Sequence, residues 1–305
     1  MSAETNTVEG AATIEAAREA QGEALQLESA HWRVLLALII DTVQEARARW
    51  LFWGLFGLST LLILFFLFVL KIDLVAGAVA VAGLPVQVSR QVFSMEKFVR
   101  SAYGFVALFL YTWGTFLAIF ASAGLMPAVL EPGRIGLLLS KPLTRPMLLM
   151  GRYLGNLLVV ALNHVYLVVS IYLIIGWKTE IWHATFLYAI PVTVFLFAVL
   201  LTVVVFIGVL SESAALSLMV SAALVFISLV LAQRQIVVKL LSSDWSRQLW
   251  EGLYWLLPKA WDLGSVMREA IQGKPAAWLD PVWTSAAFGV FVFGAAVYLF
   301  QKKDY

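Results

Sequence analysis

Six long stretches of the chain contain no Asp, Glu, Lys or Arg, and this pattern constrains the fold more than any other feature. Each has about the length, roughly 20 residues, that a helix needs to cross ~30 Å of membrane hydrocarbon. Inside lipid, backbone amides must be paired within their own segment, and no stretch alternates apolar and polar residues as a barrel strand would. The sequence therefore predicts an all-α polytopic membrane protein with six transmembrane helices. The expected spans are residues 50–70, 103–125, 153–175, 184–209, 214–232 and 282–300.

The composition agrees with this class and excludes others. Hydrophobic residues make up 62% of the chain and charged residues 13%, against about 45–50% and about 25% in soluble domains. Because the net charge is only +2, the sequence gives no electrostatic footprint for nucleic acid. The chain has no Cys and three His, which excludes disulfides and argues against a metal centre. We expect membrane lipid to be the main solvent.

Three regions are expected along the chain. Residues 1–30 carry six Glu and one Arg and are expected to form a solvated acidic tail, with partner binding as the alternative. Residues 31–49 repeat apolar side chains every three to four positions, which predicts an amphipathic helix lying in the membrane interface. The alternative is the start of an over-long first membrane helix. Residues 50–305 are expected to form the six-helix transmembrane domain.

Two connecting segments are apolar without being spans. Residues 74–84 are too few to cross a bilayer, so we expect them to be interfacial or re-entrant. Residues 233–281 are rich in Trp, and a stripe from Trp245 to Leu256 predicts amphipathic helices that rest on the outer membrane face. Gating of a substrate or docking of a partner is the alternative role of this outer segment.

Basic residues set the expected orientation. Arg47 and Arg49 precede the first span, four basic residues lie between positions 134 and 152, and Lys302 and Lys303 follow the last span. Basic clusters beside span ends are typical of the cytosolic side. Since six spans put both termini on one side, we expect both termini in the cytosol.

Polar residues inside the spans are few, and Asn163 and His164 lie near the middle of the third. Intramembrane polar side chains usually face the bundle interior. They either contact a substrate or a proton, or form interhelical hydrogen bonds that hold the packing. At the start of the same span, Gly151 and Gly155 have the spacing that allows a neighbouring helix to approach closely. Pro191 is expected to kink the fourth span.

Motifs for catalysis are missing from the sequence. It contains no GxxxxGK[ST], HExxH or GxSxG pattern, and no acidic residue falls within a predicted span. The chain therefore has no phosphate-binding loop of its own, and a proton relay of buried carboxylates has no members. We expect that the chain is not itself an enzyme and binds neither a cofactor nor a metal.

The segment 131–152 carries the strongest signal in the chain. Pro132 suits the first turn of a short helix and Pro142 ends it, which leaves an apolar face rimmed by cations. The face consists of Ile135, Leu138 and Leu139, and the rim of Arg134 and Lys141. From these residues alone, contact with lipid headgroups and docking of another protein are equally good interpretations.

This segment resembles a stretch of the membrane permease subunits of type-2 ABC exporters. The similarity lies in the run Glu131-Pro-Gly-Arg-Ile-Gly-Leu-Leu-Leu-Ser-Lys-Pro-Leu-Thr-Arg145 and in Gly151-Arg-Tyr-Leu-Gly155, which is similar to the family's entry to the third span. Residues 41–49 resemble the amphipathic entry helix of the family, and residues 253–259 its outer segment before the last span. The resemblance covers about residues 35–305 and includes the six-span layout.

The resemblance implies a permease driven by a separate ATPase subunit, which holds ATP and Mg. It implies two ATPase copies and a second permease chain, identical or a paralogue, in a prokaryotic inner membrane. It also assigns coupling to the ATPase to two inner segments. Their residues are Glu131, Arg134, Ile135, Leu138, Leu139, Lys141, Pro142 and Arg145, followed by Ser211, Glu212 and Ser213. An ATPase-independent carrier or channel is the alternative, and a membrane-embedded enzyme or a structural anchor is the remaining one.

Overall fold

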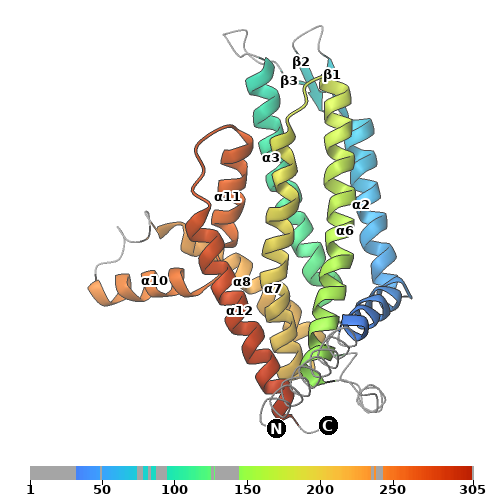
Figure 1. Cartoon of the computed structure of the whole chain (residues 1–305). Helices are drawn as coiled ribbons and strands as arrows, with labels where there is room; N and C mark the ends of the chain where they lie inside the picture. The colour runs from blue at the N-terminus through green and yellow to red at the C-terminus, as the bar shows by residue number, and fades with distance from the viewer. Residues whose placement is uncertain are drawn as a thin grey trace, which may run out of the picture.

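The computed structural model describes residues 32–48, 50–73, 78–81, 84–86, 95–124, 127, 144–234, 237 and 243–303. They form a bundle of long helices with three short strands at one end (Figure 1). Five of the described helices are long and apolar enough to cross a membrane, or six if the bent pair Trp32–Ala48 and Phe52–Phe68 counts as one span. The predicted fold class, an all-α polytopic membrane protein, is confirmed, with the small sheet as an addition.

Helices occupy all six predicted spans, although the second helix begins at Met95 rather than at residue 103 and the third extends beyond both predicted ends. They are α2 (Trp50–Val69), α3 (Met95–Ser122), α6 (Arg145–Thr179), α7 (Ala189–Ser211), α8 (Ala214–Ala232) and α12 (Leu279–Lys302). A short 3₁₀-helix, η1 (Ala184–Tyr188), leads into α7 at the predicted start of the fourth span. Charged residues therefore limit the apolar runs, but α3 and α6 continue past them: α3 includes Glu96, Lys97 and Arg100.

The third span departs most from its predicted bounds. α6 has 35 residues, roughly 52 Å at the usual helical rise, and extends beyond residues 153–175 at both ends. The prediction ends at Arg152 and Lys178 because both are charged, but both have partners within the protein. Lys178 Nζ donates to the carbonyl oxygens of Leu67 and Phe66 at the end of α2. A charged residue that is paired within the protein therefore ends the apolar run in the sequence but does not end the helix.

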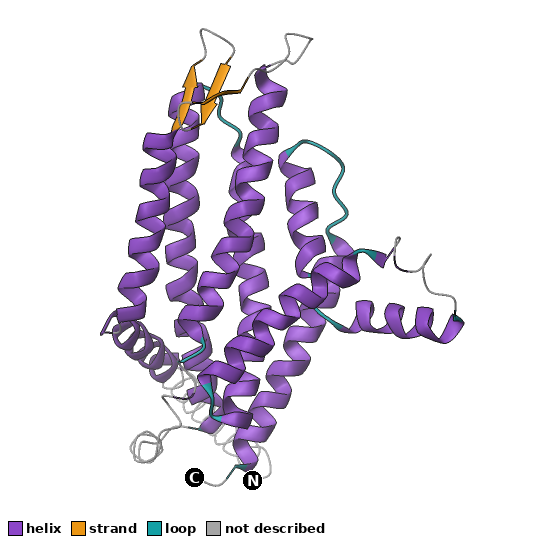
Figure 2. Cartoon of the chain, turned by 180° about the vertical axis from the view of Figure 1, so that it is seen from behind, coloured by secondary structure: helices purple, strands orange, loops and turns teal. Residues whose placement is uncertain are grey.

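The segment after α2 forms a small antiparallel sheet. Strands β1 (Leu70–Asp73), β2 (Ala78–Val81) and β3 (Leu84–Val86) pair in the order β1-β2-β3. In this register Leu70 lies opposite Val81, and Val81 opposite Leu84. The sheet lies at one end of the bundle (Figure 2), so the described part of residues 74–84 does not re-enter it. Pairing between strands satisfies the backbone groups that a segment too short to span would otherwise expose.

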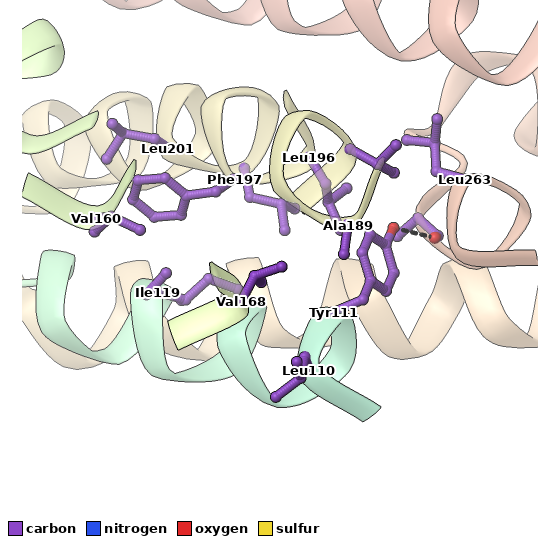
Figure 3. Packing of buried hydrophobic residues seen from close by; sticks show 14 of the residues in the cluster. Leu110, Tyr111, Ile119, Val160, Val168, Ala189, Leu196, Phe197, Leu201 and Leu263 are labelled. Carbon is purple, nitrogen blue, oxygen red and sulfur yellow. Dashed lines mark hydrogen bonds between the residues drawn. The ribbon is translucent and has the colours of Figure 1, made fainter. Parts of the chain in front are cut away.

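α7 lies at the centre of the bundle. In the most apolar stretch of this span, 72% of the residues are buried, whereas the corresponding shares are 22% for α8 and 17% for α12. Leu196 and Phe197 of α7 pack in one cluster with Leu110 and Ile119 of α3 and Val160 of α6 (Figure 3). A helix that is apolar on all sides is typically buried. The outward faces of α8 and α12 remain for lipid or for another chain.

The two helices before the last span differ in exposure. α10 (Asp244–Leu256) projects sideways from the bundle (Figures 1 and 2) and has no buried residue. α11 (Ala260–Ile271) packs against α3, where Tyr111 Oη donates to the Ala260 carbonyl (Figure 3). Gly264 makes this approach possible, because a Cβ there would lie 2.8 Å from the Tyr111 ring. The helices predicted for this segment are present, but α11 belongs to the bundle rather than resting on a surface.

Aromatic residues of α10 hold a buried cation. Lys259 is 3% exposed, and its Nζ lies 4.3 Å from the ring centroid of Tyr254 and 3.8 Å from that of Trp255. Burial lowers the pKa of Lys259, and the charges of Asp262 and Asp280 oppose that shift. Cation–π contacts of this kind stabilise a desolvated ammonium. The Trp-rich segment therefore has a packing role in addition to the expected affinity for the membrane interface.

Candidate functional site at the elbow end of the bundle

The helix Trp32–Ala48, which we call the elbow helix, lies at the end of the bundle opposite the sheet, and we call this end the elbow end (Figure 1). α6 begins and α7 ends at this end of the bundle (Figure 1), so the residues at these helix ends that were predicted to couple to an ATPase lie here: Arg145, Ser211, Glu212 and Ser213. The other predicted coupling residues lie outside the described residues. They are Glu131, Arg134, Ile135, Leu138, Leu139, Lys141 and Pro142.

The elbow helix packs on α6 through the two predicted glycines. A Cβ added at Gly151 would lie 2.6 Å from Leu38 Cβ, and one added at Gly155 would lie 2.5 Å from Thr42 Cβ. Both distances are far below van der Waals contact, so only glycine lets the two helices lie this close. The predicted close approach is confirmed, and its partner is the elbow helix.

Beside Gly151, α6 carries a buried cation that holds the elbow helix. Arg152 is 3% exposed, and its guanidinium donates to Asp41 (Nη2 to Oδ2, 2.9 Å) and to Glu45 (Nη1 to Oε2, 2.5 Å). A guanidinium fork suits two carboxylates, and a buried charge persists only with such partners. We call Arg152, Asp41 and Glu45 the elbow clamp. Sequence reasoning missed it, although Asp41 and Glu45 share one helix face at the i, i+4 spacing.

The elbow helix and α2 meet at a bend of 70°. Trp53 Nε1 donates to the Arg47 carbonyl across the bend, at 3.0 Å. The bend excludes a straight, over-long first membrane helix and agrees with the predicted amphipathic helix. On the face away from α6, Trp32, Leu36 and Ile40 remain 54% to 60% exposed, as expected for a helix at the level of lipid headgroups.

Arg145, the first residue of α6, caps another helix. Its Nη1 donates to the carbonyl oxygens of Phe300 (3.3 Å), Gln301 (3.1 Å) and Lys303 (2.6 Å) at the C-terminal end of α12. The last carbonyls of an α-helix have no donor within the helix, and a cation there also interacts favourably with the helix dipole. Arg145 therefore joins the start of α6 to the end of α12.

Lys303 continues this connection from α12 to α7. Its Nζ donates to the Val209 carbonyl at 3.0 Å and forms an ion pair with the Glu212 carboxylate. Glu212 follows the last residue of α7 with a φ of 54°, the left-handed conformation that commonly ends a helix. The Lys303–Glu212 pair is partly exposed, so a partner protein can reach it.

The two serines of the α7–α8 turn have local structural roles. Ser211 Oγ donates to the Ile207 carbonyl at 2.8 Å, and Ser213 Oγ accepts from the Leu216 amide at 3.3 Å as the N-cap of α8. Such side-chain bonds replace the backbone partners that helix ends lack. Of the three residues predicted for this turn, Glu212 is the one whose side chain reaches another helix end.

The intramembrane pair predicted in the third span faces the bundle interior. Asn163 Oδ1 accepts from Ser59 Oγ of α2 at 3.1 Å, and His164 Nε2 lies 3.3 Å from the Ala189 carbonyl of α7. Both residues thus join α6 to a neighbouring helix, as the packing interpretation requires. Whether either contacts a substrate stays a prediction.

The elbow end therefore links four helices through charged contacts. The elbow clamp joins the elbow helix to α6, Arg145 joins α6 to α12, and Lys303 joins α12 to α7. Among the described residues, no group of three or more His, Asp or Glu is placed to hold a metal ion.

No protein-family model matches the chain, and neither does any curated protein.

Proposed function

We propose that this chain is the transmembrane permease subunit of an ATP-driven ABC transporter of the type-2 exporter kind. In this role it couples a separate ATPase to movement of a substrate, or to transmission of force, across the membrane. The observation that supports the proposal most is the linkage at the elbow end. Arg145 is the last residue of the predicted docking run 134–145, Glu212 lies in the second predicted contact, and the end of α12 joins them through Lys303.

This linkage provides a physical route for coupling. An ATPase that grips the segment before Arg145 and the turn at Glu212 displaces the start of α6 and the end of α7 together. Packed helices move between discrete arrangements as rigid bodies, so closure of the ATPase on ATP is converted into movement of whole helices. The elbow clamp makes the elbow helix follow α6.

The proposal also specifies the rest of the assembly. ATP and Mg bind to the partner ATPase, which is present in two copies, while this chain binds no cofactor and is not itself an enzyme. A second permease chain, identical or a paralogue, completes the transporter. The low burial of α8 and α12, 22% and 17%, leaves surface for that chain and for lipid. The elbow end faces the cytosol of a prokaryotic cell, with both termini on that side of the inner membrane.

The test is the ATPase activity of the complex purified from its native membrane and reconstituted in lipid vesicles. Leu138→Glu places a charge on the predicted apolar docking face, and Arg145→Glu both removes the cap of α12 and reverses a charge of the docking segment. We expect each change to reduce the activity at least tenfold. Arg247→Glu makes the same reversal on the exposed helix α10 and is expected to leave the activity unchanged.

Two results contradict the proposal. One is full ATPase activity and full retention of the ATPase in the Leu138→Glu and Arg145→Glu variants. The other is transport by the chain alone in vesicles without nucleotide, which favours the carrier or channel alternative.

A further inference from the structure

A small cavity lies inside the bundle where α2, α3, α6 and α7 meet. Its lining is mostly apolar, with four polar residues among the aliphatic ones, and its free space is about that of one water molecule. All four polar residues are buried. They are Ser59 of α2, Asn163 and His164 of α6, and Thr193 of α7.

The polar atoms of these residues are only partly paired. Ser59 Oγ donates to Asn163 Oδ1, and His164 Nε2 lies beside the Ala189 carbonyl. Asn163 Nδ2 and Thr193 Oγ1 are buried without a hydrogen-bond partner among the described residues. Because buried polar groups in proteins are nearly always satisfied, two such atoms beside one cavity point to a small polar ligand.

Gly114 of α3 leaves the space that such a ligand needs. A Cβ at this position would lie 3.1 Å from His164 Nδ1, the ring nitrogen that does not face Ala189, and 3.9 Å from Thr193 Cγ2. The missing side chain therefore leaves the Nδ1 edge of the His164 ring uncovered by α3, beside the methyl group of Thr193.

We propose that this cavity binds one water molecule, which hydrogen-bonds Asn163 Nδ2, Thr193 Oγ1 and His164 Nδ1. Water accepts from the Asn163 amide and has two O–H groups, one to donate to Thr193 Oγ1 and one to donate to His164 Nδ1, so a single molecule satisfies both unpaired atoms. Buried waters typically make about three such bonds. A sodium ion fits the space less well, because the amide N–H is a donor and repels a cation.

The bound water connects α6 to α7 by hydrogen bonds, and the bond from Ser59 to Asn163 adds α2 to this group. It gives Asn163 and His164 a role in packing, and the small size of the cavity leaves no room for a transported molecule. This inference goes beyond the proposed function and does not depend on it, since it concerns the chain alone.

The sign of one stability change tests the proposal. Thr193→Val keeps the shape of the side chain and removes the hydroxyl. If the cavity holds water, the change removes a partner of that water, and we expect the thermal unfolding midpoint in detergent to fall by about 2–5 °C. If the cavity is dry, the change removes an unsatisfied buried hydroxyl and raises the midpoint, which overturns the proposal.

Thr202→Val is the matched control. Thr202 is also buried in α7, but its hydroxyl donates to the Val199 carbonyl of its own helix at 2.7 Å, so we expect a change below about 1 °C. Gly114→Ala places a methyl group in the cavity and expels the water. In that background, Thr193→Val is expected to become neutral or stabilising. An unchanged destabilisation in that background contradicts a shared water.

A measurement on the unmodified chain keeps the proposal testable if the variants do not fold, and a second measurement, with Thr193→Val as its control, tests for sodium. Hydroxyl radicals generated from bound water by X-ray irradiation are expected to label His164, whereas Phe197, equally buried in the apolar cluster, is not labelled. Absence of label at His164 overturns the proposal. A rise of the unfolding midpoint in sodium chloride over choline chloride at equal ionic strength, abolished by Thr193→Val, assigns the site to sodium and also overturns it.

Discussion

At the residue scale, the buried side chain of Arg152 joins α6 to two carboxylates of the elbow helix. Arg152→Met keeps much of the side-chain length but removes the guanidinium that Glu45, whose side chain is 15% exposed, and Asp41 both accept from. Removing one member of a largely buried ion pair is destabilising. Because Asp41 is more than half exposed and water solvates it, we expect a loss of about 2–4 kcal/mol. Denaturant unfolding in detergent measures this loss.

The control for Arg152 is Arg247→Met on α10. Arg247 and Asp244 are 3.7 Å apart and both well exposed, and exposed pairs contribute about 0–1 kcal/mol. Equal losses in the two variants contradict the clamp. A loss confined to Arg152→Met supports it.

The roles of single residues could be predicted from the sequence where they depend on the spacing of nearby residues. Gly151 and Gly155 indicate a close helix contact, and burial of Asn163 and His164 follows from the cost of polar groups in lipid. The partners of these residues do not follow. Glu45 and Arg152 are 107 positions apart, and no local pattern in the sequence specifies which charge a distant carboxylate meets.

At the scale of elements, the contact between the elbow helix and α6 depends on small residues. Gly155→Ala inserts a methyl group 2.5 Å from Thr42 Cβ, so the elbow helix must move. We expect a loss of about 1–3 kcal/mol from this overpacking. Gly54→Ala in α2 is the control, since a Cβ there meets nothing within 4 Å, and it should stabilise the helix by about 0.5–1 kcal/mol.

The displacement itself can be measured by electron paramagnetic resonance. The chain contains no Cys, so spin labels attach only where Cys is introduced. Labels at the exposed positions Ala37 and Leu158 report the distance between the elbow helix and α6. Gly155→Ala is expected to lengthen and broaden that distance. An unchanged distance with an unchanged stability shows that the glycine is not required.

The end of α12 offers a second test among the elements. Lys303→Met removes the bonds from the end of α12 to Val209 and Glu212 at the end of α7. Since the pair is partly exposed, we expect only about 1 kcal/mol of destabilisation, but a severalfold loss of ATP-driven activity in the complex. Lys302→Met is the control, because Lys302 lies over the ring of Tyr298 on its own helix. Equal activity of both variants contradicts a role of Lys303 in coupling.

The elements were largely predictable because charge delimits them. Helices occupy all six spans, and α8 has the predicted bounds, 214–232. The sheet was missed because residues 74–84 are apolar and short, a pattern that suits a strand as well as an interfacial segment. The burial of α11 was missed because it depends on Gly264 and Tyr111, a contact between distant parts of the chain.

For the whole molecule, the apolar composition predicts that lipid is the main solvent. A lipid solvent in turn predicts an all-α membrane protein, because backbone amides must be paired within each segment. What composition does not predict is the arrangement of the helices, with α7 at the centre and the ends of α6, α7 and α12 joined at one end. That arrangement connects Arg145 of the first predicted ATPase contact to Glu212 of the second. It is therefore the feature of the whole molecule on which the proposed function rests.

The mass of the complex purified in mild detergent tests the central claim most directly. Native mass spectrometry of the wild-type chain is expected to show two permease chains with two copies of a protein that contains a GxxxxGK[ST] motif. Leu138→Glu is expected to release the ATPase while the permease chains remain folded. Isolation of the chain without any nucleotide-binding protein, under conditions that preserve other membrane complexes of the same cells, contradicts the claim.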